Sequence, residues 1–342
     1  MSKVEKPRIA IIGTGMAGLA CADGLAQDFD LTLFDKSRGL SGRLSTRRAP
    51  PYAFDHGAQY FRADSAAFQQ WLKPFEAAGH VRTWLPRHVN ISADGTKTAR
   101  LDAAAKKVFA PGMSAIGKAL VAGRPQWNVY LDCGVDAVDG KAGAWVLRAG
   151  EQSFGPFAHV VLAIPPAQGQ ALLPVETSFT QALAKTKMLG CHTLMLGYAP
   201  DEAPALDWDC AHFEDDVLGF AAVNSGKPGR GGELALVLQT KHDWSQAHIE
   251  DDAEAVGATM KARFEALTGS KTFTSSSAAS GYDRVHRWRY ASAQVLATTP
   301  EQPYLLDRDQ GLSAIGDWCS GSKVEDAFLS GAALAASLRN LV

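Results

Sequence analysis

The pattern of apolar positions near the start of the chain predicts a strand–helix–strand unit. Arg8–Ile12 is a short, almost wholly apolar run of the kind found in parallel strands that are buried on both faces. Small and apolar residues then recur at helical spacing over Met16–Ala26, and Leu31–Asp35 has the pattern of a second strand. Residues 8–35 are therefore expected to form one βαβ unit, with a glycine turn between its first strand and its helix.

The middle of the chain alternates irregular stretches with short elements. Residues 36–62 are rich in Gly, Ser and Arg and are expected to be irregular. A further buried strand is predicted at Val160–Ala163, where Pro165 and Pro166 end it because proline cannot donate to the strand ladder. Between these segments the pattern predicts helices at Ser65–Ala78 and Met113–Val121, and short strands near Val129, Val135 and Trp145–Leu147.

Residues 166–300 have a different pattern, in which apolar and aromatic residues alternate with polar ones. Such alternation is typical of antiparallel strands with one buried face. The pattern therefore predicts an α/β domain and a second, α+β domain built on an antiparallel sheet. The remaining predicted elements are strands at His192–Tyr198, Leu218–Val223, Glu233–Gln239 and Leu312–Ile315, helices at Ile249–Leu267 and Val324–Leu341, and a low-complexity surface loop at Thr274–Ser280.

Composition excludes several classes of protein. A chain of 342 residues corresponds to about two domains, and its net charge of −2 argues against nucleic-acid binding, which normally needs a basic excess. The five cysteines are scattered without a C-x-x-C pair, which argues against disulfides and a metal site. No signal-peptide pattern occurs, and no apolar run approaches the roughly 20 residues of a membrane helix. We therefore expect a cytoplasmic protein that uses no membrane; its oligomeric state stays open.

The first glycine turn, Gly13-Thr14-Gly15-Met16-Ala17-Gly18, is a dinucleotide-binding fingerprint. In this motif the first glycine permits the tight turn, the second lets the backbone approach a pyrophosphate, and the third lets the helix pack on the sheet. The helix N-terminus adds free N–H groups and the positive end of a dipole. Asp35 ends the next strand, where its carboxylate can accept hydrogen bonds from a ribose diol.

Two further segments favour FAD over NAD as the cofactor. Asp35-Lys36-Ser37-Arg38-Gly39-Leu40-Ser41-Gly42-Arg43 forms a second glycine turn that can close over the same pyrophosphate, with Arg43 as a charge-assisted partner. A dehydrogenase domain normally continues into its next helix instead. Far along the chain, Gly316-Asp317 precedes the last helix, which brings a carboxylate to a sugar alcohol and a helix N-terminus to the pyrimidine end of a flavin.

Together these motifs resemble those of the flavin-dependent amine oxidase superfamily, and within it the bacterial renalase-like oxidases. The similar stretches extend over almost the whole chain and include Phe34–Arg43, Gly57–Phe61 and Gly316–Gly331. The resemblance implies a p-hydroxybenzoate-hydroxylase-like fold, in which FAD lies in a Rossmann-type domain and a substrate domain covers the flavin ring. Because Gly13 and Asp317 must meet one cofactor, the FAD-binding domain is expected to be discontinuous, comprising 1–62, 111–165 and 305–342, with the substrate domain formed by 63–110 and 166–304.

The resemblance also assigns roles to individual residues. Gln59, Tyr60 and Phe61 would lie against the flavin. The backbone of Val135 would meet the adenine, and the Val324 N–H would face a flavin carbonyl. The other implied cofactor contacts are Gly13, Gly15, Met16, Ala17, Gly18, Asp35, Lys36, Gly42, Arg43, Gly316 and Asp317.

Three residues bear on how closely the chain follows the family. Ser41 replaces a glycine of the turn before Arg43, so its backbone must avoid the angles that glycine alone adopts readily or bear their cost. Asp326 stands where glycine is usual, and its carboxylate would crowd the electron-rich edge of the flavin. Cys319 suggests a covalent flavin link, but its spacing from the last helix differs from that of monoamine oxidases, which favours noncovalent FAD.

Enzymes of this kind transfer a hydride from substrate carbon to flavin N5, and O2 reoxidises the flavin to give hydrogen peroxide. The cofactor performs the difficult step, so no protein acid or base need stand out. His286, Tyr60 and Trp288 are candidates for positioning the substrate; the alternatives are a sheet-edge histidine and aromatic core residues. The remaining candidates for substrate binding are Lys227, Arg230, Arg287 and Tyr290.

The charge of the substrate distinguishes the possible functions. Lys227 and Arg230 lie in a basic, glycine-rich loop that either holds phosphates or is a solvated surface loop. Renalase-like bacterial enzymes oxidise the 2- and 6-dihydro isomers of NAD(P)H to NAD(P)+, and a basic loop suits that dianionic substrate. An amine or polyamine oxidase would instead need acidic or aromatic walls for a cation. An electron-transfer flavoprotein and a nonenzymatic FAD-binding scaffold are further alternatives, and the preferred isomer and the choice between NAD and NADP forms stay open.

Overall fold

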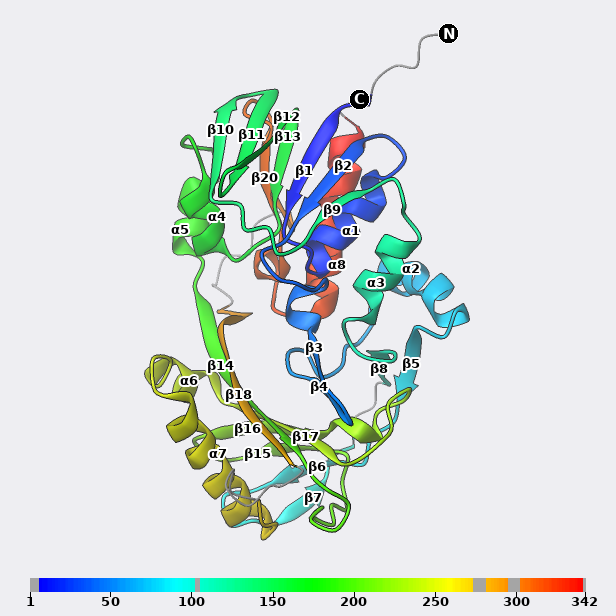
Figure 1. Ribbon diagram of the computed structural model, residues 1–342, viewed down its shortest axis with the longest axis vertical. Coiled ribbons are helices and arrows are strands. Elements are labelled where there is room, and N and C mark those ends of the chain that lie inside the picture. The colour runs from blue at the N-terminus through cyan, green and yellow to red at the C-terminus, as the bar shows by residue number, and fades with distance from the viewer. Residues whose placement is uncertain (1–5, 102–104, 273–280, 295–301, 341–342) are drawn as a thin grey trace.

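The computed structural model describes residues 6–101, 105–272, 281–294 and 302–340. These residues form an upper part around one sheet and a lower part around another, joined by long strands (Figure 1). The surface loop predicted at Thr274–Ser280 lies outside the described residues.

The upper part contains a six-stranded sheet of the Rossmann type. β1 lies near its centre and pairs in parallel with both β2 and β13, so the strand order reverses at the carboxyl end of β1. The pairing of β19 with β20 is antiparallel, and the other neighbours are parallel. In sheet order, the strands are β19 (Leu305–Asp307), β20 (Leu312–Ala314), β13 (His159–Leu162), β1 (Arg8–Ile12), β2 (Asp30–Phe34) and β9 (Asn128–Tyr130). The predicted α/β domain is confirmed.

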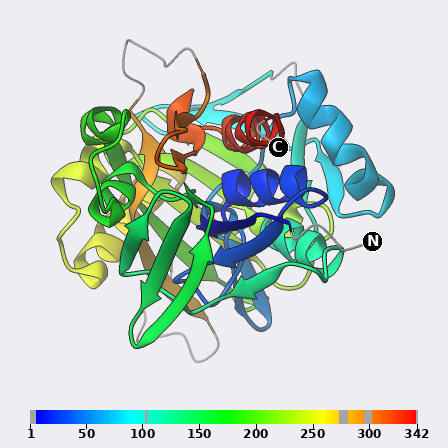
Figure 2. The ribbon, with the colours of Figure 1, turned by 90° about the horizontal axis from the view of Figure 1, so that it is seen from above.

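The first and last helices of the chain pack against each other on this sheet. α1 (Met16–Leu25) and α8 (Val324–Arg339) lie side by side in both ribbon views (Figures 1 and 2). A Cβ at Gly331 of α8 would lie 2.1 Å from the Ala17 carbonyl oxygen of α1. Only glycine permits this approach, which brings the N-termini of both helices to the same end of the sheet.

A small antiparallel sheet and two short helices also belong to the upper part. β10 (Ala137–Lys141), β11 (Ala144–Ala149) and β12 (Gln152–Phe157) form the sheet. Their buried Trp145 and Phe157 share one core with Phe179 and Leu183, which belong to the region of α4 (Pro166–Leu172) and α5 (Thr180–Lys185). Val135 precedes β10 and is not part of a strand, contrary to the prediction.

The lower part contains a seven-stranded mixed sheet. Its strand order is β18 (Tyr282–Ala293), β14 (Met188–Gly197), β17 (Ala235–Thr240), β16 (Leu218–Val223), β15 (Cys210–Phe213), β6 (His88–Ile91) and β7 (Lys97–Ala99). The predicted antiparallel arrangement holds except between β15 and β6, which are parallel. The long strands β14 and β18 extend upward from this sheet toward the upper part (Figure 1).

Two helices cover the outer face of the lower sheet. α7 (Ala253–Thr268) packs on it through a core that includes Met260, Phe264 and Leu194. The sequence predicted one helix from Ile249, but α6 (His242–Ala247) is separate and α7 begins only after Asp252. The Asp252 carboxylate accepts hydrogen bonds from the backbone N–H groups of residues 254 and 255 and so fixes the start of α7. Among the described helices, none has the length and apolarity needed to cross a membrane.

The boundaries between the two parts differ from the predicted ones. The segment 63–110 is divided, because α2 (Ala66–Ala77), β5 (Val81–Trp84) and β8 (Lys106–Phe109) bury their apolar residues in the core of the upper part. Only β6 and β7 of this segment join the lower sheet. Residues 166–185 also pack on the upper part, through α4 and α5. α3 (Ala115–Ala122) and the β3–β4 hairpin (Thr46–Ala49 and Tyr52–Asp55) complete the fold.

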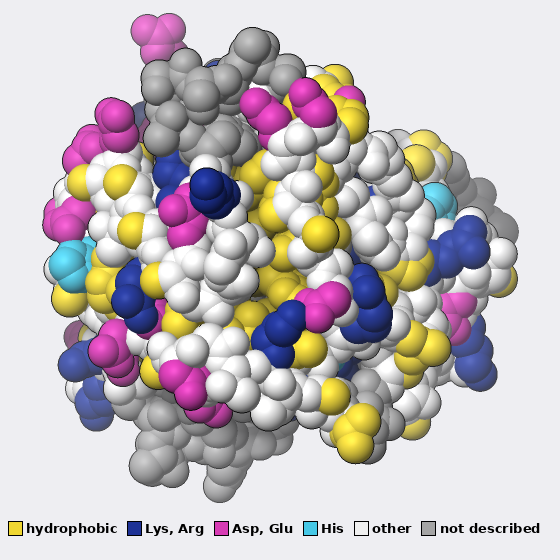
Figure 3. Space-filling model, turned by 90° about the horizontal axis from the view of Figure 1, so that it is seen from below, with side chains coloured by type: hydrophobic (Ala, Val, Ile, Leu, Met, Phe, Trp, Pro, Cys, Tyr) yellow, Lys and Arg dark blue, Asp and Glu magenta, His cyan; other side chains and the backbone are white. Residues whose placement is uncertain are grey.

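The charged surface agrees with the near-neutral composition. On the face seen from below, basic and acidic side chains are interspersed around a central hydrophobic strip (Figure 3).

One buried carboxylate ties α8 to α2. Glu325 is 7% exposed, and its two oxygens accept hydrogen bonds from the backbone N–H groups of Asp64 and Ser65, at 3.0 and 2.7 Å. Burial alone would raise the pKa of Glu325, but these hydrogen bonds hold it below the usual range. The carboxylate therefore stabilises the start of α2 from across the domain.

Glu325→Gln is expected to lower the free energy of unfolding by about 1–2 kcal/mol at pH 7, because charge-assisted hydrogen bonds are replaced by weaker ones. The folded-state pKa is depressed, so this stabilisation is fully present above the unfolded-state value of about 4.3 and is lost as the pH falls through the folded-state pKa. Urea titrations at pH 7 and pH 3.5 measure the difference. Glu76→Gln, which removes one partner of an exposed pair with Lys107, serves as the control. Equal destabilisation by the two variants would contradict the assignment.

Candidate active site

The glycine turn after β1 has the geometry that a dinucleotide requires. Gly13 has φ +106°, and a Cβ there would lie 2.3 Å from the Ala163 carbonyl oxygen. A Cβ at Gly18 would lie 2.0 Å from the Gly13 carbonyl oxygen, so neither position admits a side chain. A Cβ at Gly15, by contrast, would have no atom within 4 Å. The turn is therefore closely packed at Gly13 and Gly18 and open at Gly15, where a pyrophosphate could approach the N-terminus of α1.

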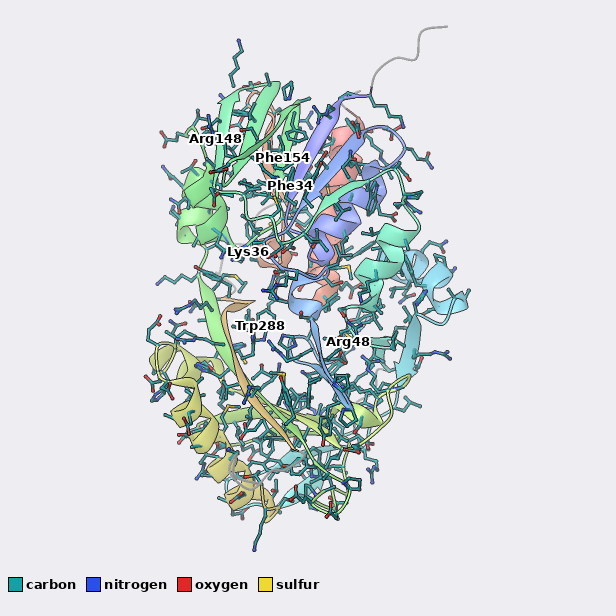
Figure 4. All side chains as sticks on the ribbon, viewed as in Figure 1. Phe34, Lys36, Arg48, Arg148, Phe154 and Trp288 are labelled. Atoms are coloured by element: carbon teal, nitrogen blue, oxygen red, sulfur yellow. The ribbon has the colours of Figure 1, made fainter. Side chains whose placement is uncertain are left out.

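Asp35 lies directly beside this turn. Its Oδ2 accepts hydrogen bonds from the backbone N–H and the hydroxyl of Thr14, at 2.9 and 2.7 Å, and its Oδ1 accepts one from the Ser37 N–H at 2.8 Å. Oδ1 keeps a lone pair for a ribose hydroxyl. Lys36 is the next residue in the chain and is exposed. Figure 4 labels it between the two parts of the molecule. Val135 packs at the edge of the neighbouring core.

Ser41 adopts a left-handed backbone conformation, which is energetically costly for any residue other than glycine. Its φ of 85° is normally left to glycine, but hydrogen bonds hold it there. The Ser41 hydroxyl donates to the Ser114 carbonyl at 3.1 Å and accepts from the Gly117 N–H at 3.2 Å. The hydroxyl of Ser41 therefore connects the second glycine turn to the start of α3. Glycine, which the family usually has here, could not make these hydrogen bonds.

An ion pair joins the second glycine turn to the segment before α8. Arg43 donates to both carboxylate oxygens of Asp317, at 2.8 and 2.5 Å, and also to the Ala291 carbonyl on β18 at 3.0 Å. This bidentate geometry is strong and directional. Gly42 precedes Arg43, and Gly316 precedes Asp317, so the structure brings together residues that the sequence placed at one cofactor.

A cavity of about 500 Å³ lies between the upper part and the inner face of the lower sheet. From the upper part, Met16, Arg43, Asp317 and Val324 reach it, and these were all predicted cofactor contacts. From β18, the predicted Trp288 reaches it, and Figure 4 shows this side chain between the two parts. The other lining residues are Ser41, Leu44, Gly57, Ala58, Cys191, His212, Gly219, Phe220, Gln239, Thr240, Lys241, His242, Ala291, Ser292, Ser322, Lys323 and Ala327.

Strand register accounts for the sheet side of this cavity. Thr193 of β14 is opposite His286 on one side and Gln239 on the other. Gln239 is in turn opposite Phe220, and Phe220 is opposite His212. Directly opposed residues face the same side of a sheet, so five strands contribute one row of side chains. Of these, Gln239, Phe220 and His212 line the cavity.

His286 lies behind the cavity wall rather than in it. Its ring packs edge-on against Trp288 and His56, with ring centroids 4.4 and 4.8 Å apart. The Trp288 indole N–H donates to the His56 carbonyl at 2.8 Å. Burial, and secondarily Arg47, lowers the pKa of His286 to about 4, so its imidazole is neutral at pH 7. His286 therefore supports Trp288, and of the three predicted positioning residues, His286, Tyr60 and Trp288, Trp288 is the one that lines the cavity.

Gln59, Tyr60 and Phe61 do not line the cavity. Phe61 is 4% exposed and stacks on Phe109 at 4.5 Å in the hydrophobic core. Tyr60 is half-buried, with its ring 6.1 Å from those of Trp84 and Phe220. In their place, the backbone of Gly57 and Ala58, from the same segment, forms this part of the wall.

Lys227 and Arg230 bind a carboxylate of this chain instead of substrate phosphates. Asp55 is fully buried and accepts hydrogen bonds from Lys227 Nζ at 3.2 Å and Arg230 Nη2 at 2.6 Å. Although burial alone would raise the pKa of Asp55, the two cations hold it below the usual range. Burial lowers the pKa of Lys227 to about 8. Neither alternative considered for these two residues, a phosphate site or a solvated surface loop, agrees with the structure, because both side chains are buried and paired with Asp55 and neither lines the cavity.

The predicted substrate contact of Arg287 is also wrong. Its neighbour Trp288 faces the cavity, so Arg287 points to the opposite face of β18, where it donates to the Ile249 carbonyl at 2.6 Å and to Glu250 at 3.2 Å. Tyr290 is half-buried and does not line the cavity, because β18 has an irregular register between Trp288 and Ser292.

The last two departures from the family pattern have structural explanations. Asp326 turns back to accept a hydrogen bond from the Lys323 N–H at 2.9 Å, so it caps α8. Cys319 is 1% exposed and does not reach the cavity, and burial raises the pKa of its thiol to about 12. A buried, protonated thiol is unsuited to a covalent flavin link.

Sequence reasoning missed most of the cavity's polar side chains. His212 and Gln239 come from the lower sheet, Lys241 and His242 from the start of α6 after β17, and Lys323 from the turn before α8. The alternating pattern of the strand that ends near Gln239 shows which residues share a face with Gln239. Only the register between strands shows which of the two faces of the sheet lies against the upper part. Among the described residues, no cluster of three or more His, Cys, Asp or Glu side chains is arranged to hold a metal ion.

The fold and the glycine turn are those of an FAD-dependent oxidoreductase of two parts, with a cavity between them. Comparison with known families agrees: residues 11–75 match the NAD(P)-binding Rossmann-like domain, and residues 92–338 match the flavin-containing amine oxidoreductases. Since the second match covers most of the chain, the protein belongs to the flavin-containing amine oxidoreductase family, and its cofactor is FAD.

Solved structures share the fold at low sequence identity. A putative protoporphyrinogen oxidase from Exiguobacterium sp. 255-15 is similar over 100% of both chains, with a TM-score of 0.79 and 11% identity. A putrescine oxidase solved with putrescine is similar over 98% of this chain and 99% of its own, with a TM-score of 0.71 and 13% identity. These likenesses establish the architecture.

Asp35→Asn is expected to raise the dissociation constant of FAD about ten-fold, because the ribose hydroxyls lose a charged acceptor. The amide keeps the shape of the carboxylate, but its NH2 must face a backbone N–H that Asp35 now accepts from, so the protein without FAD is also expected to lose about 1–2 kcal/mol of stability. Titration of the apoprotein with FAD, followed by flavin fluorescence, measures the affinity. Asp132→Asn, at an exposed carboxylate near Arg38, is the matched control. Unchanged FAD affinity in Asp35→Asn would remove Asp35 from the cofactor site.

Asp55→Asn is expected to destabilise the protein by about 3–5 kcal/mol, because it leaves two buried cations without their carboxylate. Urea unfolding at pH 7 provides the measurement. Asp207→Asn, which breaks the exposed pair with Lys97, should have little effect by comparison. A loss in Asp55→Asn no larger than that in the control would show that the buried cluster does not support the fold.

Proposed function

We propose that the protein oxidises the 2- or 6-dihydro isomers of NAD(P)H to NAD(P)+, with O2 as the electron acceptor and hydrogen peroxide as the second product. The observation that carries this proposal is the charge of the cavity. Its lining contains three permanent cations, Arg43, Lys241 and Lys323, and one carboxylate, Asp317. Since Asp317 is already paired with Arg43, the cavity offers two lysines to an anionic substrate.

A dinucleotide suits this lining because its pyrophosphate carries two negative charges. Lys241 follows β17 and Lys323 precedes α8, and both are exposed at the cavity, where they can approach a substrate that extends into solvent. The N-terminus of α8 adds the positive end of its dipole. An amine substrate would meet repulsion from the same groups, which weighs against the oxidation of polyamines.

The residues around the cavity fit FAD and assign tasks to the protein. Gly13, Gly15 and Asp35 would hold the adenosine diphosphate portion, and Met16, Arg43 and Val324 reach the cavity where the ring would lie. When bound, FAD supplies the redox chemistry by accepting a hydride from the substrate and passing its electrons to O2.

The chain itself contributes position and exclusion of water rather than acid–base catalysis. Trp288 and Phe220 provide flat apolar surfaces at the cavity. The buried imidazole of His286 is neutral at pH 7 and lies behind Trp288. Oxidation of a dihydropyridine to a pyridinium removes a hydride and no proton from the ring, so the substrate's half of the reaction requires no protein base.

The decisive experiment mixes the FAD-loaded protein anaerobically with 2- and 6-dihydro-NAD(P), with ordinary NADH and with a panel of amines including putrescine. We expect rapid loss of the oxidised-flavin absorbance with the isomeric dihydronicotinamides, and slow or no loss with the amines. Reduction by amines and not by the isomers would replace this proposal with amine oxidation. Failure to reduce the flavin with any of them would favour a nonenzymatic FAD protein.

Lys241→Glu and Lys323→Glu are expected to raise KM for the dihydro-dinucleotide about ten-fold or more, because each reverses a charge facing the substrate. The effect should shrink at high ionic strength, since exposed charges are screened. Lys118→Glu, an exposed lysine on α3 away from the cavity, is the control. If all three variants keep the wild-type KM at low salt, the cavity charge is not what attracts the substrate.

A further inference from the structure

A chain of hydrogen bonds that begins at buried Lys227 fixes the orientation of two glutamine amides. Lys227 Nζ can only donate, and it donates to Gln59 Oε1 at 3.0 Å. The amide of Gln59 therefore directs its Nε2 the other way, toward the carbonyl oxygens of Asp55 and Gly57, at 2.5 and 3.1 Å. The buried cluster thus holds the Gly57 carbonyl at the edge of the cavity wall.

The Gly57 carbonyl in turn orients Gln239. A carbonyl oxygen can only accept, so the Gln239 group that contacts it must be the amide nitrogen, at 2.8 Å. Gly57 has little freedom to move, because a Cβ there would lie 1.9 Å from the Arg43 carbonyl oxygen and the Ala58 N–H donates to that same oxygen. Among the residues that the structure describes, none donates to Gln239 Oε1. The side chain that lines the cavity therefore presents an acceptor with a fixed orientation.

We propose that Gln239 Oε1 accepts a hydrogen bond from the carboxamide NH2 of the dihydropyridine ring and so selects nicotinamide over nicotinate dinucleotides. This inference rests on the proposed function. A carboxamide offers two N–H donors, whereas a carboxylate offers none and would place an anionic oxygen against Oε1. Phe220 is opposite Gln239 in the strand register and provides an apolar surface beside it.

The charge of the cavity makes this selection necessary. With Lys241 and Lys323 at the site, the more negative nicotinate form would otherwise bind more tightly than the nicotinamide form. A preference for the carboxamide needs a specific acceptor that opposes the general attraction. Gln239 is an acceptor of this kind, since its amide cannot turn without breaking the bond to Gly57.

The test compares NAD+ with nicotinic acid adenine dinucleotide as ligands of the FAD-loaded protein, and the 2- and 6-dihydro forms of both as substrates. Dissociation constants come from perturbation of the flavin spectrum, and kcat/KM from oxygen consumption. We expect the wild type to favour the nicotinamide form about ten-fold in both measurements. Gln239→Leu should bring both ratios to about one or below, mainly by weakening the nicotinamide form. Gln239→Met is a second variant of similar size, and Gln170→Leu on exposed α4 is the control.

Flavin content and the melting temperature establish that each variant is folded. Ratios that stay at the wild-type value in both folded Gln239 variants would overturn the role of Gln239, as would a wild type that does not distinguish the two ligands. If the wild type oxidises none of the dihydro forms, the proposed function fails, while the ratio of dissociation constants still tests Gln239. A change in both ratios in Gln170→Leu as large as that in Gln239→Leu would also contradict the inference.

Discussion

The carboxylate of Asp55, fully removed from water, is the constraint on which the arrangement of the two parts depends. Its negative charge must be balanced by groups in direct contact with it, because an unpaired buried charge costs several kcal/mol of folding free energy. The lower part supplies two cations, Lys227 and Arg230, and the upper part supplies the Met113 N–H and the Thr46 hydroxyl. These partners lie on three segments of the chain, so satisfying one carboxylate aligns the β3–β4 hairpin, the loop after β16 and the segment before α3. The cavity wall at residues 57 and 58 follows directly from this alignment.

Local chemistry allowed much of the nucleotide site to be predicted from the sequence. Gly13, Gly15 and Gly18 follow from turn geometry, and Asp35 follows from its place at the end of β2. These are short-range relations, and the structure shows the expected packing around them. Arg43 and Asp317, which the sequence assigned to one cofactor, contact each other in the structure. The close packing of α8 on α1 brings the segment before α8 to the same end of the sheet as the glycine turns.

The substrate side could not be predicted in the same way, because it depends on long-range pairing. Lys227 and Arg230 look like solvated residues of a glycine-rich loop, and nothing near them in sequence reveals that Asp55 is their partner. Gln239 reaches the cavity through the register of four strands, and Arg287 faces away through the same register. Alternation shows that a strand has two faces, but which face meets the cofactor domain is set only by tertiary contacts.

The contact between α1 and α8 has a consequence for synthesis of the protein. The FAD site needs both α1 and α8, and the ribosome begins α8 only about 300 residues after it has completed α1. During translation the βαβ unit therefore leaves the ribosome with the face that receives Gly331 uncovered, and FAD cannot yet stabilise it. The cofactor therefore cannot bind when the βαβ unit first emerges, and the nascent segment must avoid aggregation without it while about 300 further residues are made.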